Sequence, residues 1–184
     1  MLTTSVLISG LRAAEPDPAL LDAVHASGTQ IDTAGMAVLG GWAVVNIAGG
    51  VAGSLTADDP RQQAFHQGNA AWNVVNLAIA GGGLASARRR SAAHPQWPEL
   101  PVDLAKQRGV LLFNLGLDVA YTSSGALLWT QRDDPRLQGL GQALTLQGTF
   151  LAAFDLSMIL LSARSAAQLK PYLSQDTLGV ALTF

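Results

Sequence analysis

Two aspartates are the residues best placed to do chemistry in this sequence. Asp118 is the only charged residue between positions 109 and 131, and Asp155 is the only one between positions 137 and 163. Carboxyl groups inside such apolar stretches are costly to keep, and in membranes they mark sites for protons, ions or ligands. If the two lie close together in a low dielectric, we expect at least one to hold a proton, because two like charges there cannot both ionise. Their chemistry would be the uptake of a proton, a cation or a small polar ligand.

A second polar set is built mainly from amides. One stripe of a helix would carry a histidine and three asparagines, spaced three, four and three residues apart: His66, Asn69, Asn73 and Asn76. Further polar or aromatic groups lie beside them or in the other apolar stretches: Trp42, Asn46, Trp72, Asn114 and Tyr121. An amide without a partner is expensive in hydrocarbon, so these groups must face other protein segments. Two interpretations stay open: they hydrogen-bond across helices and fix the packing, or they join Asp118 and Asp155 in a site.

Four long, charge-poor stretches must position these groups, at residues 34–57, 66–87, 109–131 and 137–163. Each has the length of a transmembrane helix. Hydrophobic residues make up 49% of the 184 residues and charged residues 13%, which is unusual for a soluble protein. We therefore predict an all-α, polytopic membrane protein with a four-transmembrane-helix bundle over residues 34–163. The alternative is a soluble bundle of very apolar helices, which would leave few polar positions for wetted helix faces.

Three segments outside these stretches carry most of the basic charge. Residues 1–33 form a polar lead, in which an apolar cluster predicts a short amphipathic helix capped by Asp17. Residues 88–108 hold five basic residues and several prolines and predict a loop, and residues 164–184 form a tail. The lead, the loop and the tail together hold eight of the eleven basic residues. The positive-inside tendency then places both termini in the cytoplasm.

Several function classes lack support in the composition. The net charge of -2 and the lack of a basic stripe give no indication of nucleic-acid binding. Without cysteine there is no thioether attachment for haem and no thiolate metal site. Of the three histidines only His66 lies in a predicted membrane helix, so we expect no metal site and no cofactor. The sequence has no phosphate loop, no serine with its base and no zinc-type HExxH, and we expect the protein not to be an enzyme.

Four segments carry a resemblance to a known family. They read GMAVLGGWAVVNI, FHQGNAAWNVVNLAIAG, LLFNLGLDVAY and LQGTFLAAFD, and the combination of FHQxNAAWNxxN with FNxGLDxxY is specific. Over residues 34–163 the chain resembles an uncharacterised bacterial four-helix integral membrane family, a domain of unknown function. The resemblance implies a four-helix membrane domain and brings no activity with it. The matching positions are Trp42, Asn46, His66, Asn69, Trp72, Asn73, Asn76, Asn114, Asp118, Tyr121 and Asp155.

These features support two hypotheses for the function. The first is a non-catalytic accessory or structural subunit, embedded in the lipid bilayer of the bacterial inner membrane and docked to other subunits of a larger membrane complex. The second is a small carrier or binder of a proton, cation or small polar ligand at the intramembrane Asp and Asn groups. A membrane enzyme ranks last, because only the two aspartates would support catalysis.

Overall fold

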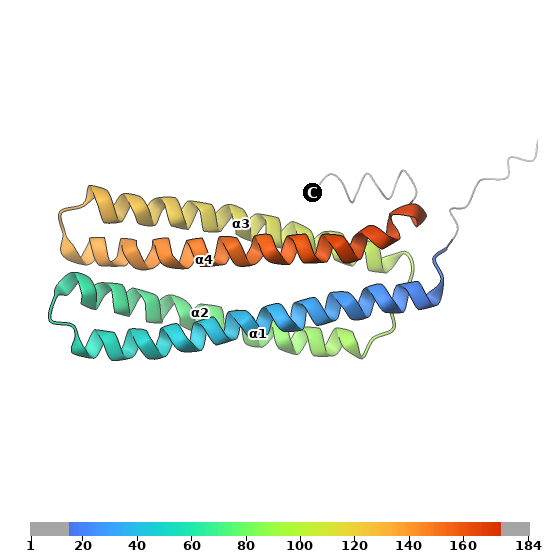
Figure 1. The fold of residues 1–184 in the computed structure, drawn as a ribbon, viewed down its shortest axis with the longest axis horizontal. Coiled ribbons are helices and arrows are strands. Elements are labelled where there is room, and N and C mark those ends of the chain that lie inside the picture. The colour runs from blue at the N-terminus through green and yellow to red at the C-terminus, as the bar shows by residue number, and fades with distance from the viewer. Residues whose placement is uncertain (1–14, 174–184) are drawn as a thin grey trace, which may run out of the picture.

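The computed structural model describes residues 15–173, which form four long α-helices and one short 3-10 helix. Residues 1–14 of the predicted lead and 174–184 of the predicted tail lie outside this range. The helices run along one long axis as a bundle (Figure 1). In chain order they are α1 (Pro18–Thr56), α2 (Pro60–Ser91), α3 (Glu99–Gln131), α4 (Pro135–Ala166) and the 3-10 helix η1 (Ala167–Tyr172). The prediction of an all-α fold with four helices is confirmed for the described residues.

Three of the helices begin at an Asp-Pro pair. The side chains of Asp17, Asp59 and Asp134 each accept a hydrogen bond, of 2.8, 2.9 and 2.8 Å, from the backbone N–H two residues ahead. The proline that follows each aspartate lies in the first helical turn, where its missing N–H costs nothing. The cap predicted at Asp17 is therefore present, but it starts a long helix and not a short one.

The first helix extends far beyond the stretch predicted from its apolar residues. α1 has 39 residues, so the predicted boundary near residue 34 lies inside a continuous helix. No proline follows Pro18 until Pro60, and the polar residues between the cap and the apolar stretch do not interrupt a helix. At about 1.5 Å per residue α1 is about 58 Å long, nearly twice a bilayer core of roughly 30 Å.

The loop predicted at residues 88–108 is much shorter in the structure. α2 continues through its three arginines to Ser91, because positive charge is favourable at a helix C-terminus. α3 begins at Glu99 with Pro101 in its first turn, where a proline is tolerated. Only residues 92–98 lie between the two helices. The charge and proline content of residues 88–108 therefore indicate the ends of two helices and not a long loop.

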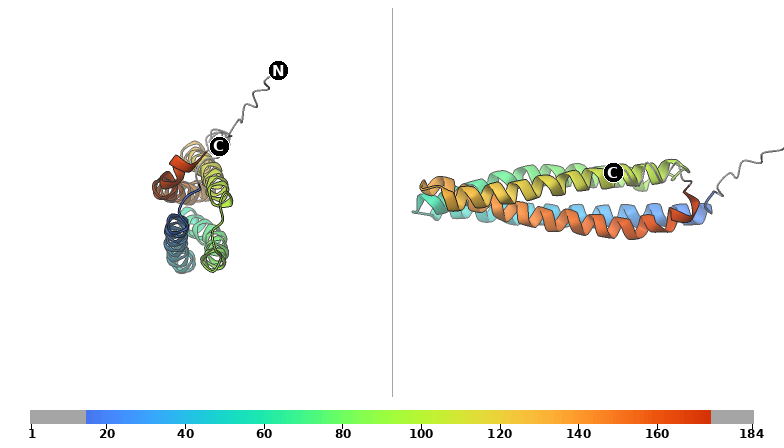
Figure 2. Two further views of the ribbon diagram at one scale, coloured as in Figure 1. Left: turned by 90° about the vertical axis from the view of Figure 1, so that its right-hand side faces the viewer. Right: turned by 90° about the horizontal axis from the view of Figure 1, so that it is seen from above.

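The four helices pack as two hairpins. α1 lies along α2 and α3 lies along α4 (Figure 2), and the two hairpins are joined by α4, which packs against α2 and less extensively against α1. Glycines make the close contacts within the hairpins possible. A Cβ atom added at Gly50 would lie 2.7 Å from the carbonyl oxygen of His66, and one at Gly148 would lie 2.7 Å from the backbone nitrogen of Thr122. By contrast, α2 and α3 share almost no close contacts.

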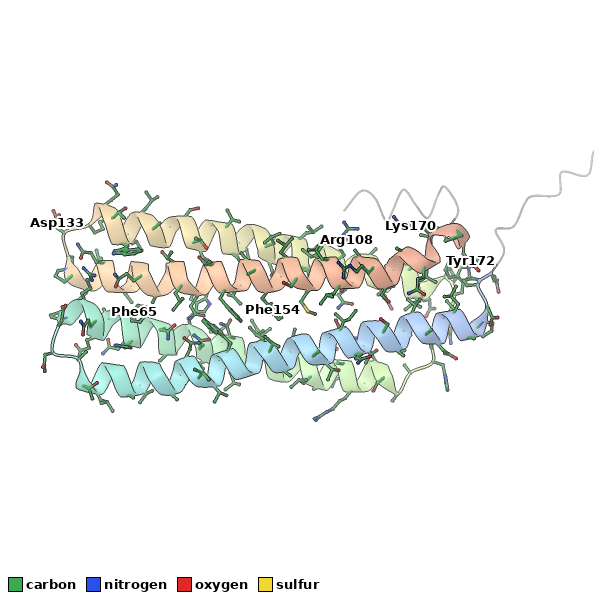
Figure 3. All side chains as sticks on the ribbon, in the orientation of Figure 1. Phe65, Arg108, Asp133, Phe154, Lys170 and Tyr172 are labelled. Atoms are coloured by element: carbon green, nitrogen blue, oxygen red, sulfur yellow. The ribbon has the colours of Figure 1, made fainter. Side chains whose placement is uncertain are left out.

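Burial in the bundle is inverted relative to a water-soluble protein. Large aliphatic side chains are exposed on all four helices, among them Val45, Val75, Val110 and Leu160, and Figure 3 draws the side chains around the ribbon. The buried set includes seven amide and carboxyl side chains: Asp32, Asn69, Asn73, Asn76, Asp118, Gln147 and Asp155. Several amide and carboxyl side chains therefore turn inward, beside a set of buried apolar residues, while many large aliphatic side chains turn outward.

Three of the helices are long and apolar enough to cross a membrane. They are α1, α3 and the continuous segment Pro135–Tyr172. Among the described helices α2 does not meet this measure, because its asparagines, glutamines and arginines lower its mean hydropathy. The composition of α2 thus differs from that of its neighbours, although its length of 32 residues is similar.

A small conventional core closes the end of the bundle at which α2 and α3 are linked. Leu21 and Val24 of α1 pack there with Leu100 of α3 and Leu169 of η1, and Trp97 of the loop covers them. These residues belong to the segments that the sequence predicts as lead, loop and tail. The three predicted segments therefore meet and extend the bundle beyond its apolar part.

Candidate functional site

A network of amide side chains, here called the amide cluster, lies between α1, α2 and α4. It consists of Trp42, Asn46, Asn69, Asn73, Asn76 and Gln147. The Asn69 Nδ2 donates to Asn46 Oδ1 at 2.9 Å, and the Asn76 Nδ2 donates to Asn73 Oδ1 at 3.3 Å. The Asn73 Nδ2 donates to the backbone oxygen of Asn69 at 2.8 Å. Every member takes part in at least one of these bonds or in those of Gln147.

Gln147 is the centre of the amide cluster, and it was not among the predicted site residues. Its Oε1 accepts from Trp42 Nε1 at 3.0 Å and from Asn76 Nδ2 at 3.5 Å, and its Nε2 donates to Asn69 Oδ1. The side chain is completely buried. A single amide next to Gly148 in an apolar stretch is a weak signal, but its spacing of eight residues from Asp155 puts both on one side of α4.

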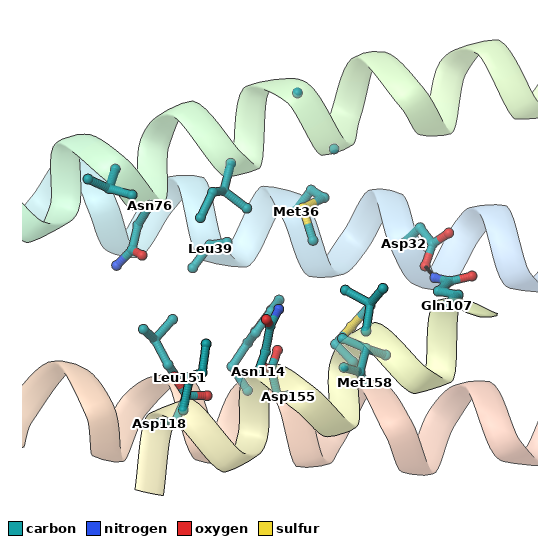
Figure 4. A pocket seen from close by; sticks show the side chains of 18 of the residues that line it. Asp32, Met36, Leu39, Asn76, Gln107, Asn114, Asp118, Leu151, Asp155 and Met158 are labelled. Atoms are coloured by element: carbon teal, nitrogen blue, oxygen red, sulfur yellow. Dashed lines mark hydrogen bonds between the residues drawn. The ribbon is translucent and has the colours of Figure 1, made fainter. Parts of the chain in front are cut away.

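A cavity of about 640 Å³ adjoins the amide cluster along the bundle axis. We call it the acid cavity, because Asp118 of α3 and Asp155 of α4 line it (Figure 4). All four helices contribute to its walls. Its other polar lining includes Asn114 and Tyr121 of α3 and Asn76 of α2, and Asn76 thereby belongs to both regions. The remaining walls are mainly apolar.

Asp118 has an unusual environment for a buried carboxyl group. It is 4% exposed, and its Oδ2 atom has no hydrogen-bond partner in the described part of the chain. Asp155 is 5% exposed and lies close enough for the two side chains to share a hydrogen bond through a proton. A buried polar atom without a partner is costly. Asp118 thus lines the acid cavity with a carboxyl group that donors of the described residues do not fully saturate.

An aromatic contact closes one end of the acid cavity. The indole of Trp72 on α2 meets the ring of Tyr121 on α3 edge to face, with ring centroids 4.9 Å apart. Both residues line the cavity. This pair is a direct contact between two helices that otherwise hardly touch.

A charged cluster closes the other end. The Arg90 Nη2 on α2 lies 2.6 Å from Oδ2 of Asp32 on α1, and Gln107 on α3 donates to the second oxygen of Asp32. We call these three residues the ionic bridge. The sequence placed Asp32 in a polar lead and Arg90 in a loop, so neither was predicted to face the bundle interior. The available signal was the helical spacing of Asp32 with Gly35 and Leu39, which are buried on the same face.

The structure divides the predicted site residues into four groups. Trp42, Asn46, Asn69 and Asn73 lie in the amide cluster only, and Trp72, Asn114, Asp118, Tyr121 and Asp155 lie on the acid cavity only. Asn76 takes part in both. His66 belongs to neither group, because its ring packs between Gly53 and Phe65 at the contact of α1 with α2.

The donor set in the acid cavity suits some ligands better than others. Within the described residues no three His, Cys, Asp or Glu side chains come together as they would around a metal ion. Two carboxyl groups with an amide at hand can instead hold a proton or neutralise one positive charge. The arrangement offers charge recognition in an otherwise apolar cavity.

Comparison with known proteins identifies a family but no activity. A model described as "Family of unknown function (DUF6992)" matches residues 38–156, which include both the amide cluster and the two aspartates. No curated protein and no solved structure matches the chain.

Proposed function

The chain belongs to the DUF6992 family of unknown function, and from that premise we propose that it is an integral membrane protein whose acid cavity binds a small cation or polar ligand. Two observations support the proposal. One is the inverted burial of the bundle, and the other is the unpartnered Asp118 oxygen beside the cavity.

The inverted burial supports insertion of all four helices in a bilayer. The outer face of α2 is apolar although its mean composition is not, since Val74, Val75, Leu77 and Ile79 are 40–57% exposed while the asparagines face inward. In a bilayer such a helix satisfies its amides inside the bundle and leaves aliphatic groups for the lipid. In water the same surface would be a large exposed apolar patch, which soluble monomers avoid.

The distribution of basic residues supports an orientation with both termini in the cytoplasm. Seven described lysines and arginines lie at the end where α2 and α3 are linked, and three lie at the opposite end: Arg61, Arg132 and Arg136. The positive-inside tendency favours the first end for the cytoplasm. The resemblance of four segments to a bacterial membrane family makes the bacterial inner membrane the location that we propose.

The unpartnered oxygen of Asp118 is the observation that carries the binding function. Each member of the amide cluster makes at least one side-chain hydrogen bond within the bundle, whereas this buried carboxyl oxygen has no partner among the described residues. The volume of about 640 Å³ falls within the roughly 300–1,000 Å³ of small-molecule sites. A ligand with a positive or hydrogen-bonding group would interact with the two carboxyl groups that line the cavity and fill the space.

The test is to isolate the protein from its own membrane in native nanodiscs and identify what accompanies it by native mass spectrometry. We expect resistance to carbonate extraction and a bound small species that Asp118→Asn loses. Asp133→Asn, the same chemical change at an exposed turn, should retain that species. Loss of the protein to the carbonate supernatant, or equal occupancy in both variants, would contradict the proposal.

A second candidate is an accessory subunit of a larger membrane complex. Several glycines on the outer surface face open space, among them Gly41, Gly49 and Gly81, and small outward residues permit close docking of another transmembrane helix. The same isolation separates the two candidates. Stoichiometric membrane-protein partners without a bound small species would favour the subunit.

A further inference from the structure

The acid cavity opens sideways, between α2 and α3. Three residues that line it are also among the most exposed aliphatic residues of the bundle: Val75 at 57%, Ile79 at 54% and Val110 at 60%. They lie on the two helices that share almost no close contacts. The mouth of the cavity is therefore apolar and faces the surroundings of the bundle.

Along the bundle axis both ends of the cavity are bridged. The Trp72 and Tyr121 rings meet at one end, and the ionic bridge of Asp32, Arg90 and Gln107 spans α1, α2 and α3 at the other. The amide cluster adjoins the cavity through Asn76 and fills the space between α1, α2 and α4 with hydrogen-bonded side chains. In a bilayer a ligand would reach the cavity most directly from the lipid side.

Apart from the ionic bridge at one end, the interior of the acid cavity combines one pair of carboxyl groups with mainly apolar walls. Leu39, Leu111, Leu151, Phe154 and Met158 line the cavity around the Asp118–Asp155 pair. A bare divalent ion prefers about six oxygen ligands, and a cavity with mainly apolar walls is a poor match for that coordination. An ammonium group needs only carboxylate and amide oxygens as acceptors, and Asn114 is positioned on the same wall as Asp118. The apolar walls suit a hydrocarbon body.

We propose that the acid cavity takes up a lipophilic amine, which enters from the bilayer between α2 and α3 and places its ammonium group on Asp118 and Asp155. This inference rests on the proposed function and names the class of ligand for the same site. The hydrocarbon body of the amine packs against the leucines, Phe154 and Met158, and the ammonium group pairs with the carboxyl groups of Asp118 and Asp155. The two carboxyl groups favour a positively charged ligand, and the apolar opening between α2 and α3 favours entry from the lipid.

The first experiment measures binding to the purified protein in nanodiscs by isothermal titration calorimetry, with empty nanodiscs subtracted for partition into lipid. The probes are phenylbutylamine, the neutral phenylbutanol of the same shape, and sodium, potassium and magnesium ions. We expect one saturable site for the amine, with binding at least about tenfold weaker for the alcohol and for Asp118→Asn. Asp155→Asn should weaken binding as well, and circular dichroism with thermal melting checks that both variants fold.

The second experiment tests the lateral route with two neighbouring glycines. Gly82 lines the cavity and Gly81 does not, and a side chain at either position would meet open space. Gly82→Leu should slow association of the amine at least about tenfold, measured by stopped-flow fluorescence, while Gly81→Leu leaves the rate unchanged. Equal rates for the two variants would overturn the lateral route.

The outcomes separate this inference from the proposed function. Saturable binding of an inorganic ion that depends on Asp118, without amine binding, would overturn the amine class and leave the proposed function standing. Alcohol bound as tightly as amine would also overturn the amine class. If no probe binds above the empty-nanodisc control, and the native nanodiscs also carry no bound species, both fail.

Discussion

The amide cluster and the acid cavity are adjacent regions of one polar interior, yet they differ in how their polar groups are satisfied. In the amide cluster side-chain amides of three helices bond to one another around Gln147, which is completely buried. In the acid cavity two carboxyl groups border empty space, and an oxygen of Asp118 has no partner. Saturated polar groups hold helices together, whereas an unsaturated one beside a cavity lowers stability and is available to a ligand.

Replacing the centre of the amide cluster should have the largest effect on stability. In Gln147→Leu the side chains of Trp42, Asn76 and Asn69 each lose a partner. With hydrogen bonds worth about 0.6 to 1.7 kcal/mol each in membrane proteins, the free energy of unfolding should fall by about 2–4 kcal/mol. SDS titration of mixed micelles, followed by circular dichroism, measures this change.

The matched control for Gln147 is an exposed polar residue of the same helix. Thr149→Val should alter the free energy of unfolding by less than about 0.5 kcal/mol. If Gln147→Leu were as stable as this control, the amide cluster would not stabilise the packing of the helices. The structural role that we assign to this region would then be wrong.

Breaking the ionic bridge should have the next largest effect. Arg90→Ala leaves the buried carboxylate of Asp32 with Gln107 as its remaining side-chain partner. Arg90 is 44% exposed, so water compensates in part, and we expect a loss of about 1–3 kcal/mol in the same unfolding assay. Arg89→Ala, at the exposed neighbouring position, should change stability little. Equal losses in the two variants would show that the ion pair contributes nothing specific.

Removing the carboxyl groups from the acid cavity should change stability in the opposite direction. Asp118→Leu combined with Asp155→Leu replaces both buried carboxyl groups with apolar groups of similar size and leaves neither without its partner, so stability should rise by about 1–2 kcal/mol. The same variant should no longer bind the amine probe. A loss of stability comparable to that of Gln147→Leu would mean that Asp118 is structural, and the two regions would then serve one purpose.

The aromatic bridge gives the smallest expected change. Tyr121→Leu removes the edge-to-face contact with Trp72 and should lower stability by about 0.5–1.5 kcal/mol, measured by the same titration. Tyr121→Phe keeps the ring and should remain near the native value. If the two variants were equally destabilised, the hydroxyl group and not the ring contact would be responsible.

The sequence predicted the helices well where apolar residues dominate and less well at their ends. The central parts of α1, α3 and α4 follow from long uncharged stretches. The positions of the helix ends depend on capping and on the extension of the helices beyond their apolar stretches, neither of which hydropathy records. Asp17 shows this, because its cap was predicted but the length of the helix that it starts was not.

Among the site residues, periodicity predicted shared faces but not partners. The spacing of Asn69, Asn73 and Asn76 places them on one face of α2, and they are buried together. Gln147 escaped prediction because its partners come from two other helices, which no local pattern reveals. The cavity itself could not be predicted, since it results from the separation of α2 and α3 in the packed bundle.

The loop at residues 92–98 is the only covalent link between the two hairpins in the described chain. Each hairpin has its own short turn, and an Asp-Pro pair starts the helix that follows this turn: α2 in the first hairpin and α4 in the second. A chain divided between Ala93 and His94 should therefore reassemble from two co-expressed fragments. Asp32 and Asn76 would come from one fragment and Asp118 and Asp155 from the other, so a ligand that occupies the reunited molecule would also favour its association.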